Sequence, residues 1–183
     1  MFELDQFVAD CRSALAADKS HKFVREVVAR AVSDPNAVLK GLGEPTRGML
    51  KSLYRSDDLT ILNIIWAPYM TLQPHNHNMW GVIGIYTGRE DNIYWRRVSD
   101  SQRVEAAGAR ALGQGDTDPM GRDLIHSVTN PIPRLTGAIH VYGGDFFGAE
   151  RSEWNAETLE EQRWDPERAV RRFEEANRIM IGA

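Results

Sequence analysis

Between residues 60 and 142 the chain alternates short runs of apolar and β-branched residues with turn sequences, and this pattern constrains the fold more than any other feature. The runs span residues 60–66, 80–86, 92–98, 103–112 and 136–142. The turn sequences between them include residues 87–88, 113–116 and 130–133. Several short strands at this spacing are typical of an antiparallel sandwich or barrel. The middle of the chain is therefore predicted to be a closed β-structure.

The N-terminal part of the chain is predicted to be helical. Its apolar residues recur at helical spacing, at Leu4, Phe7, Val8, Cys11 and Leu15. A second helix is predicted from Phe23 to Ala31, with a stop at residues 33–35, and a short third helix over residues 36–40.

The C-terminal part is also predicted to be helical. Asp165 is the expected cap of a helix that has Pro166 in its first turn. The expected buried stripe of this helix is Ala169, Val170, Phe173, Ala176 and Met180. A shorter helix is predicted over residues 156–162, with Asn155 as its cap.

A length of 183 residues fits one domain, which we divide into N-terminal helices (residues 1–46), a β-barrel (47–148) and C-terminal helices (149–183). A chain of this size buries enough surface to fold without disulfides or metal. The single cysteine, Cys11, excludes an intrachain disulfide. Its position in a helical stripe indicates a small buried side chain rather than a reactive thiol.

The charge balance bears on the partners. Twenty-six acidic and 22 basic residues leave a formal charge of −4, which offers no attraction to nucleic acid or to an anionic membrane surface. The first residues are acidic, and no apolar run approaches the roughly 18 residues of a membrane span. We therefore expect a cytoplasmic protein that acts on small molecules. A monomer and a symmetric oligomer both fit this composition.

His75 and His77 lie two residues apart, directly after a predicted strand. Side chains at i and i+2 of an extended segment project from the same face, so both imidazoles can reach one metal ion. Such a pair also arises by chance on protein surfaces, and by itself it is a weak signal.

A second segment strengthens the metal interpretation. Its characteristic residues are Gly113, Pro119, Gly121, His126 and Asn130. Their spacing resembles the second motif of the cupin superfamily, and the pair His75 and His77 followed by Gly88 resembles the first. The resemblance implies a small jelly-roll barrel, the cupin double-stranded β-helix, with His75, His77 and His126 as metal ligands inside it. A cupin-like barrel that has lost its metal is the alternative.

One position departs from the common cupin pattern. A glutamate usually follows the second histidine with three or four residues in between, and at those places this chain has Gly81 and Val82. Glu90 and Asp91 lie beyond the Gly88 turn, too far along to replace it. Three neutral imidazoles leave the charge of a divalent ion uncompensated and coordination positions open. Such a site suits an anionic substrate, particularly a thiolate, and dioxygen.

The loss of that glutamate is typical of the thiol dioxygenases, the cysteine dioxygenase-like cupins. The segment from Ala138 to Gly143 also resembles their Ser-x-His-x-Tyr segment, with His140 and Tyr142 matching and Ala138 in place of the serine. The resemblance implies an Fe(II) enzyme that oxidises a small carboxylate-bearing thiol with O2 to its sulfinate. It assigns His140 and Tyr142 to a hydrogen-bond relay beside the metal. Burial in the barrel interior without a catalytic role is the alternative for both.

In mammalian-type members of that family an arginine in a Tyr-x-Arg segment holds the substrate carboxylate. Arg55 is the candidate by position, because it follows Tyr54 and precedes the strand that leads to the ligands. A surface position for Arg55 fits the sequence equally well.

Two other functions stay open at this point. One is a cupin metalloenzyme, a dioxygenase or isomerase, that acts on another small metabolite with a different metal, since imidazole ligands alone do not select iron. The other is a non-catalytic cupin binding protein.

Overall fold

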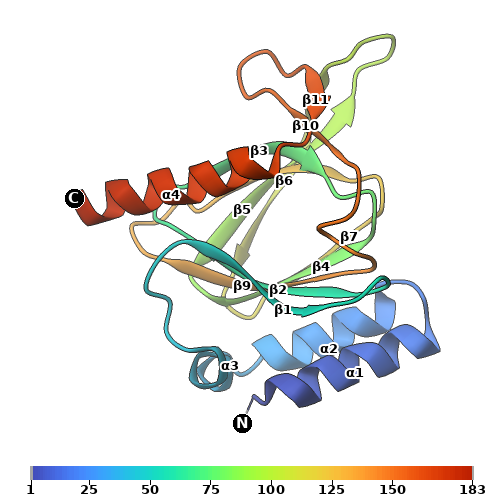
Figure 1. Cartoon of the computed structure of the whole chain (residues 1–183), viewed down its shortest axis with the longest axis vertical. Coiled ribbons are helices and arrows are strands. Elements are labelled where there is room, and N and C mark those ends of the chain that lie inside the picture. The colour runs from blue at the N-terminus through green and yellow to red at the C-terminus, as the bar shows by residue number, and fades with distance from the viewer. Residues whose placement is uncertain (1, 183) are drawn as a thin grey trace.

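The computed structural model describes residues 2–182, which form two facing antiparallel sheets with helices outside them (Figure 1). The helices are α1 (Leu4–Ala17), α2 (Lys22–Val32), α3 (Pro35–Leu42) and α4 (Pro166–Gly182). The strands are β1 (Met49–Arg55), β2 (Thr60–Trp66), β3 (Thr71–Asn76), β4 (Gly81–Thr87), β5 (Arg89–Arg97), β6 (Val104–Gly113), β7 (Thr117–Met120), β8 (Ile125–Thr129), β9 (Thr136–Tyr142), β10 (Ser152–Trp154) and β11 (Glu161–Arg163).

The strand order identifies the architecture. One sheet runs β1-β2-β9-β4-β7 and the other runs β11-β10-β3-β8-β5-β6. The eight strands β2 to β9 therefore pair in nested fashion, β2 with β9, β3 with β8, β4 with β7 and β5 with β6, like one long hairpin rolled into a barrel. This is the order of a jelly roll, or double-stranded β-helix. The predicted fold class, a mainly β jelly-roll barrel with helices at both ends, is confirmed.

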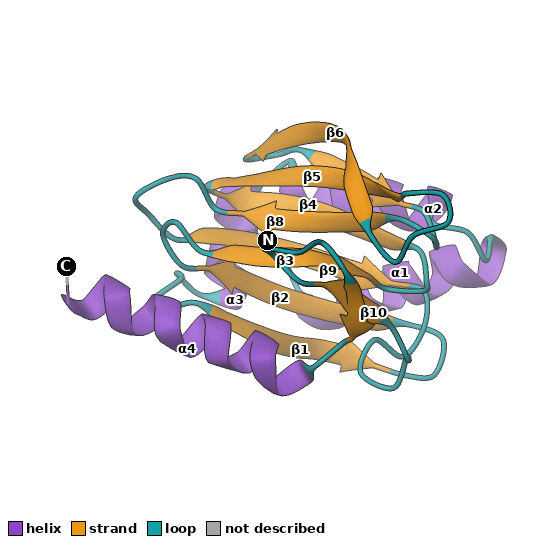
Figure 2. Cartoon of the chain, turned by 90° about the horizontal axis from the view of Figure 1, so that it is seen from above, coloured by secondary structure: helices purple, strands orange, loops and turns teal. Residues whose placement is uncertain are grey.

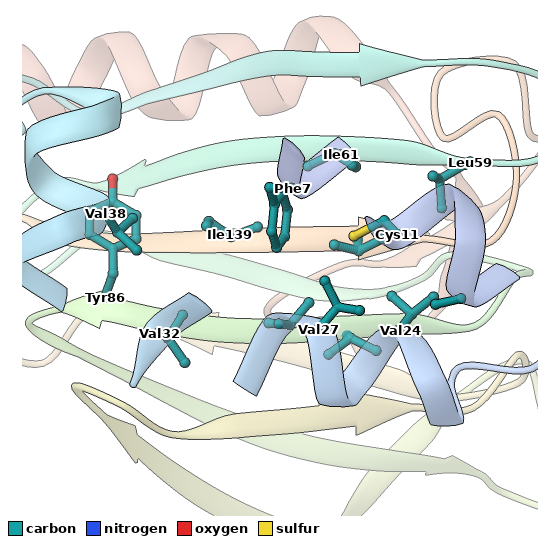
Figure 3. Close-up of a cluster of buried hydrophobic side chains, with 14 of the residues drawn as sticks. Phe7, Cys11, Val24, Val27, Val32, Val38, Leu59, Ile61, Tyr86 and Ile139 are labelled. Carbon is teal, nitrogen blue, oxygen red and sulfur yellow. The ribbon is translucent and has the colours of Figure 1, made fainter. Parts of the chain in front are cut away.

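Successive side chains along the strands of the five-stranded sheet belong alternately to two apolar clusters, one on each face of the sheet. Ile61 on β2 and Ile139 on β9 point outward to α1, α2 and α3, and Figure 3 shows them against Phe7 and Cys11. Leu62, on the other face of β2, points into the barrel. Because β2, β4 and β9 are buried on both faces, their sequences read as nearly unbroken apolar runs.

The N-terminal helices match their predicted positions to within a few residues. Asp34 caps α3 by accepting a hydrogen bond from the Ala37 N–H, and Pro35 occupies the first turn. Cys11 is fully buried, and burial raises the pKa of its thiol to about 12. The thiol is therefore protonated at neutral pH and serves as a core side chain, as the helical stripe predicted.

Helix α4 lies alongside β1 at the side of the barrel (Figure 2). Asn177 holds it there by a pair of hydrogen bonds, accepting from the Gly48 N–H at 2.6 Å and donating to the Gly48 carbonyl at 2.8 Å. Arg168 pairs with the buried Glu153 of β10. Of the predicted stripe, Phe173 is buried, whereas Val170 is 57% exposed because it faces an open groove.

The predicted helix over residues 156–162 is wrong. The chain makes a turn there and continues as β11, which pairs with β10 and so adds two strands to the sheet within the segment predicted as C-terminal helices. Asn155 does cap backbone N–H groups, accepting from Glu157 and Thr158. Leu159 then adopts a left-handed φ of 58°, which a helix cannot accommodate.

The sequence pattern did not predict β1, β7 or β8 as strands. Strands β7 and β8 have only four and five residues, and β1 directly follows the turn residues Pro45 and Gly48. Within residues 2–182, none of the helices has the length and apolar character required to cross a lipid bilayer.

Candidate metal centre

His75 and His126 are brought together by the pairing of β3 with β8. The two residues are direct partners in the antiparallel register, so their side chains lie next to each other on the barrel's inner face. His77 follows the end of β3 and points to the same side, as the period of two predicted.

A bulge in β3 decides which face these histidines use. Leu72 pairs with Val128 and His75 with His126, so three steps along β3 match two steps along β8. The extra residue shifts the inward-facing positions from the even to the odd series. Pro74, which lacks an N–H to donate to the ladder, lies in this bulge.

The three imidazoles form a compact buried cluster. One nitrogen from each of His75, His77 and His126 lies within 4.8 Å of the others, a spacing from which all three can bind one cation. All three side chains are at least 96% buried. The sequence-predicted ligand set is thus assembled in one place, and the cluster contains no carboxylate.

Hydrogen bonds orient two of the rings for metal binding. His75 Nδ1 is 2.9 Å from the Gln73 carbonyl, and His126 Nδ1 is 2.7 Å from the Asn92 side-chain oxygen. Both Nδ1 atoms therefore donate, which leaves each Nε2 with a free lone pair directed at the cluster. His77 Nε2 is 3.0 Å from His126 Nε2, to which it donates.

The electrostatic setting keeps the cluster neutral. Burial lowers the pKa of His75 to about 4, and burial followed by the charges of neighbouring histidines holds the pKa of His77 and His126 well below the usual range. At neutral pH all three rings are therefore uncharged, which is the form that binds metal. Three imidazole nitrogens are a donor set that suits iron, zinc, copper or nickel.

Arg151 lies beside this cluster and has no acidic partner among residues 2–182. Its guanidinium carbon lies 3.9 Å from the ring centroid of Phe146 and 4.4 Å from that of Trp164. It donates through Nη1 to His77 Nδ1 at 3.2 Å, while its Nε has no hydrogen-bond partner among the described residues. Burial lowers its pKa to about 10, so it is cationic at neutral pH. A buried cation without an anion is costly unless a ligand supplies one.

Arg55, the sequence-based candidate for the substrate carboxylate, lies elsewhere. It forms a two-pronged ion pair with Asp145, with distances of 2.8 and 2.7 Å, and its side chain is half exposed. It lines neither the cavity at the imidazoles nor the groove outside it. Arg55 is the last residue of β1, which is the edge strand of its sheet.

His140 and Tyr142 project from β9 into the barrel beside the cluster, as their spacing predicted. His140 Nδ1 is 3.0 Å from the Tyr142 hydroxyl, and the Tyr142 ring packs on His77 with a centroid separation of 4.8 Å. Burial raises the pKa of Tyr142, so its hydroxyl is protonated at neutral pH. Ala138, two residues before His140, is fully buried on the same strand.

Two spaces with shared lining residues adjoin the cluster. The inner cavity, about 30 Å³, is lined by the three histidines, His140 and Tyr142 and has room for a water molecule or two. The outer groove, about 420 Å³, lies between α4 and β1 and is lined by Arg151 and by apolar residues of both elements. Phe146 and Trp164 border both spaces, so a ligand larger than a few atoms has to extend past them.

Sequence reasoning missed Arg151, Trp164, Asn92 and Glu90. Arg151 and Trp164 lie on a segment after the last barrel strand, where no periodicity marks them as inward-facing. Asn92 and Glu90 alternate along β5 with exposed residues, a signal that indicates only an inward face. The signal that could have identified them is a polar residue on a strand face that is otherwise apolar and buried.

No protein-family model matches the chain. Among solved structures, similarity is found to an RmlC-like cupin family protein from Methanocaldococcus jannaschii (10% identity over 57% of this chain and 87% of that one, TM-score 0.48). A conserved protein with a double-stranded beta-helix domain from Klebsiella pneumoniae has 12% identity over 60% of this chain and 83% of that one, with a TM-score of 0.47. DMSP lyase DddQ from Ruegeria pomeroyi has 20% identity over 56% of this chain and 50% of that one, with a TM-score of 0.45. Similarity at this level transfers no activity, and the fold is assigned from the strand order alone.

Proposed function

We propose that this protein is an iron-dependent thiol dioxygenase that converts a small carboxylate-bearing thiol to its sulfinate with O2. One observation carries the proposal. A neutral cluster of three buried imidazoles lies in direct contact with a buried arginine, Arg151, that has no acidic partner among the described residues. The first feature suits a cation and the second suits an anion, so the two together fit a ligand with one metal-binding end and one anionic end.

The donor set fits a divalent metal. His75 and His126 present Nε2 lone pairs, and their Nδ1–H groups are held by Gln73 and Asn92. Iron held by these nitrogens would supply open coordination positions and the redox capacity to join O2 to sulfur. Because the cluster contains no carboxylate, the charge of the metal would be left for an anionic thiolate to balance.

Arg151 is the residue that we assign to the substrate carboxylate. Its planar guanidinium suits two parallel hydrogen bonds to a carboxylate, and the flanking rings of Phe146 and Trp164 hold the plane in one orientation. The indole N–H of Trp164 is buried and has no partner among residues 2–182, so it is a further donor for the same anion. A neutral His77 that binds metal through Nε2 carries its proton on Nδ1, which frees the Arg151 N–H groups for the substrate.

We assign Tyr142 and His140 to the orientation of the substrate and to proton transfer. The Tyr142 phenol lines the inner cavity against His77 and remains protonated because it is buried. Its hydrogen bond with His140 fixes the hydroxyl within the cavity. Apolar walls from Leu72, Val128 and Phe173 limit the access of bulk water.

Oxygen consumption by the iron-loaded protein tests the proposal. We expect consumption of one O2 per thiol, with the sulfinate as product, for 3-mercaptopropionate or L-cysteine. Cysteamine, which carries no carboxylate, should be a poor substrate because it leaves Arg151 unpaired. The His75→Ala variant, exposed to the same iron, is the control for oxidation by free metal.

Lack of thiol-dependent O2 consumption by protein that retains stoichiometric iron would overturn the dioxygenase assignment. It would favour a cupin metalloenzyme with another substrate. Protein that binds no divalent metal would favour the non-catalytic binding protein.

A further inference from the structure

Glu90 on β5 is a fully buried carboxylate that the site described so far does not use. Its exposed fraction is 0%, and it points into the barrel. Oε2 accepts a hydrogen bond from Trp66 Nε1 at 2.7 Å, and Oε1 accepts one from Asn92 Nδ2 at 2.9 Å. No arginine or lysine of residues 2–182 pairs with it. A carboxylate in this position is expensive to bury, and two neutral donors offset only part of that penalty.

The remaining polar neighbour of Glu90 is His140. The distance from His140 Nε2 to Glu90 Oε2 is 3.5 Å, which is longer than a hydrogen bond but short for an interaction between buried groups. Among the described residues, Nε2 has no other polar partner. Nδ1 of the same ring faces the Tyr142 hydroxyl at 3.0 Å. Glu90, His140 and Tyr142 thus lie in sequence across the barrel interior.

This arrangement determines where the His140 proton lies. A lone pair on Nε2 would face the carboxylate oxygen and be repelled by it, whereas an N–H would be attracted. The neutral ring therefore carries its proton on Nε2, and Nδ1 is an acceptor. The Tyr142 hydroxyl then donates to Nδ1, and its oxygen lone pairs remain free toward the inner cavity.

We propose that Glu90 is the positioning residue of a buried carboxylate–imidazole–phenol relay that takes up the proton of the substrate thiol. This rests on the proposed function. The S–H proton passes to the Tyr142 oxygen as the Tyr142 proton passes to His140 Nδ1, so the thiol becomes a thiolate and the tyrosine stays neutral. The imidazolium so formed lies next to the Glu90 carboxylate, which balances its charge.

Ala138 lacks the side-chain hydroxyl that would continue the relay. The thiol dioxygenases that the sequence resembles have a serine at this place, and Ala138 offers no polar side-chain atom to His140. In this chain the partner comes from β5, in the opposite sheet. Glu90 also receives the Asn92 amide, whose oxygen holds His126. One carboxylate thereby orients both a metal-binding ring and the relay ring.

The first test is independent of any activity. Long-range ¹H–¹⁵N NMR spectra of the full chain, labelled with ¹⁵N-histidine and loaded with zinc, report which ring nitrogen of each histidine is protonated. The His140 signal is identified by its absence in His140→Gln. At neutral pH we expect a proton on His140 Nε2 and none on Nδ1. A proton on Nδ1 would overturn the proposal, whether or not the protein oxidises thiols.

The second test uses Glu90→Gln in the iron-loaded enzyme. Removal of the charge should lower kcat by about 10- to 100-fold, as for other partners one step removed from a site. Glutamine keeps an oxygen that can accept from the Asn92 amide, so the support of His126 remains and KM and bound iron should stay within about threefold. The matched control is Asp91→Asn, which neutralises the next carboxylate along β5, whose partner is Arg89, and which should leave kcat unchanged.

A double-mutant cycle separates positioning from a general structural effect. If Glu90 acts through His140 and Tyr142, then Glu90→Gln combined with Tyr142→Phe should lose no more activity than Tyr142→Phe alone. If the fold-loss of activity in the double variant equals the product of the losses in the two single variants, the relay is overturned. An enzyme that oxidises no thiol contradicts the proposed function only, since the His140 proton can still be located by NMR.

Discussion

At the scale of single residues, burial and one partner atom decide what each polar side chain can do. Arg55 and Arg151 show this most clearly. Arg55 is half exposed and already neutralised by Asp145, so a further anion gains little there. Arg151 is buried against two aromatic rings and has no acidic partner in the part of the chain that the structure describes, so an incoming carboxylate gains a charge-assisted contact in a site shielded from water.

Replacement of a clustered histidine should abolish metal binding. His126→Ala removes one of three nitrogens and leaves an incomplete set, so we expect loss of stoichiometric iron or zinc with unchanged circular dichroism. His21→Ala is the matched control, because His21 lies at the start of α2 with no side-chain cap hydrogen bond. Metal analysis after dialysis measures both, and full metal content in His126→Ala would remove that residue from the ligand set.

Replacement of Arg151 should act on substrate binding. Arg151→Met removes a charge-assisted carboxylate contact worth about 1.5–3 kcal/mol, so KM for the acidic thiol should rise roughly 10- to 100-fold. Arg55→Met should change KM less than about twofold. Steady-state O2 consumption compares the two variants, and equal effects would mean that the carboxylate binds elsewhere.

At the scale of elements, the bulge in β3 and the attachment of α4 shape the site. Because of the bulge, the side chains of His75 and His77 point into the barrel, and without it they would point to the other face of the sheet. Helix α4 closes the side of the inner cavity with Phe173 and forms one wall of the outer groove. Its position depends on Asn177, whose amide pairs with both backbone groups of Gly48.

Removal of that attachment should weaken the fold. Asn177→Ala leaves the buried N–H and carbonyl of Gly48 unpaired, so we expect a loss of about 2–4 kcal/mol in the free energy of unfolding. Glu175→Ala, on the exposed side of α4, should change it by less than about 0.5 kcal/mol. Urea titration measures both. Similar losses for the two variants would show that the contact between Asn177 and Gly48 adds nothing to the free energy of unfolding.

At the scale of the whole molecule, the fold contains two apolar clusters, one between the helices and the five-stranded sheet and one inside the barrel. The outer cluster joins α1, α2 and α3 to the five-stranded sheet (Figure 3) and contains none of the three histidines. The inner cluster surrounds them and lowers the pKa of each ring by excluding water. The barrel is therefore expected to fold without metal but to be sensitive to acid.

The metal-free protein should lose stability as the pH falls below about 6.5. In the folded state the pKa of His75 is about 4, whereas in the unfolded chain it is near 6.5, so between these values the unfolded chain binds more protons. His75 alone accounts for about 3 kcal/mol of this loss, which is complete near pH 4. Urea unfolding across this range measures it. His75→Ala should show a shallower pH dependence, and an unchanged slope would contradict the assignment.

The sequence by itself determined the mainly β barrel and the helices at both ends, because these follow from local periodicity and from turn residues, which act over a few positions. The period of two also put His75 and His77 on one face, whereas the grouping of His126 with them came from the resemblance to the two cupin motifs. Only the tertiary structure decided that Arg151 rather than Arg55 lies at the imidazoles and that Glu90 faces His140. Those outcomes depend on strand register, on one bulge and on burial between distant segments, and no local pattern encodes them.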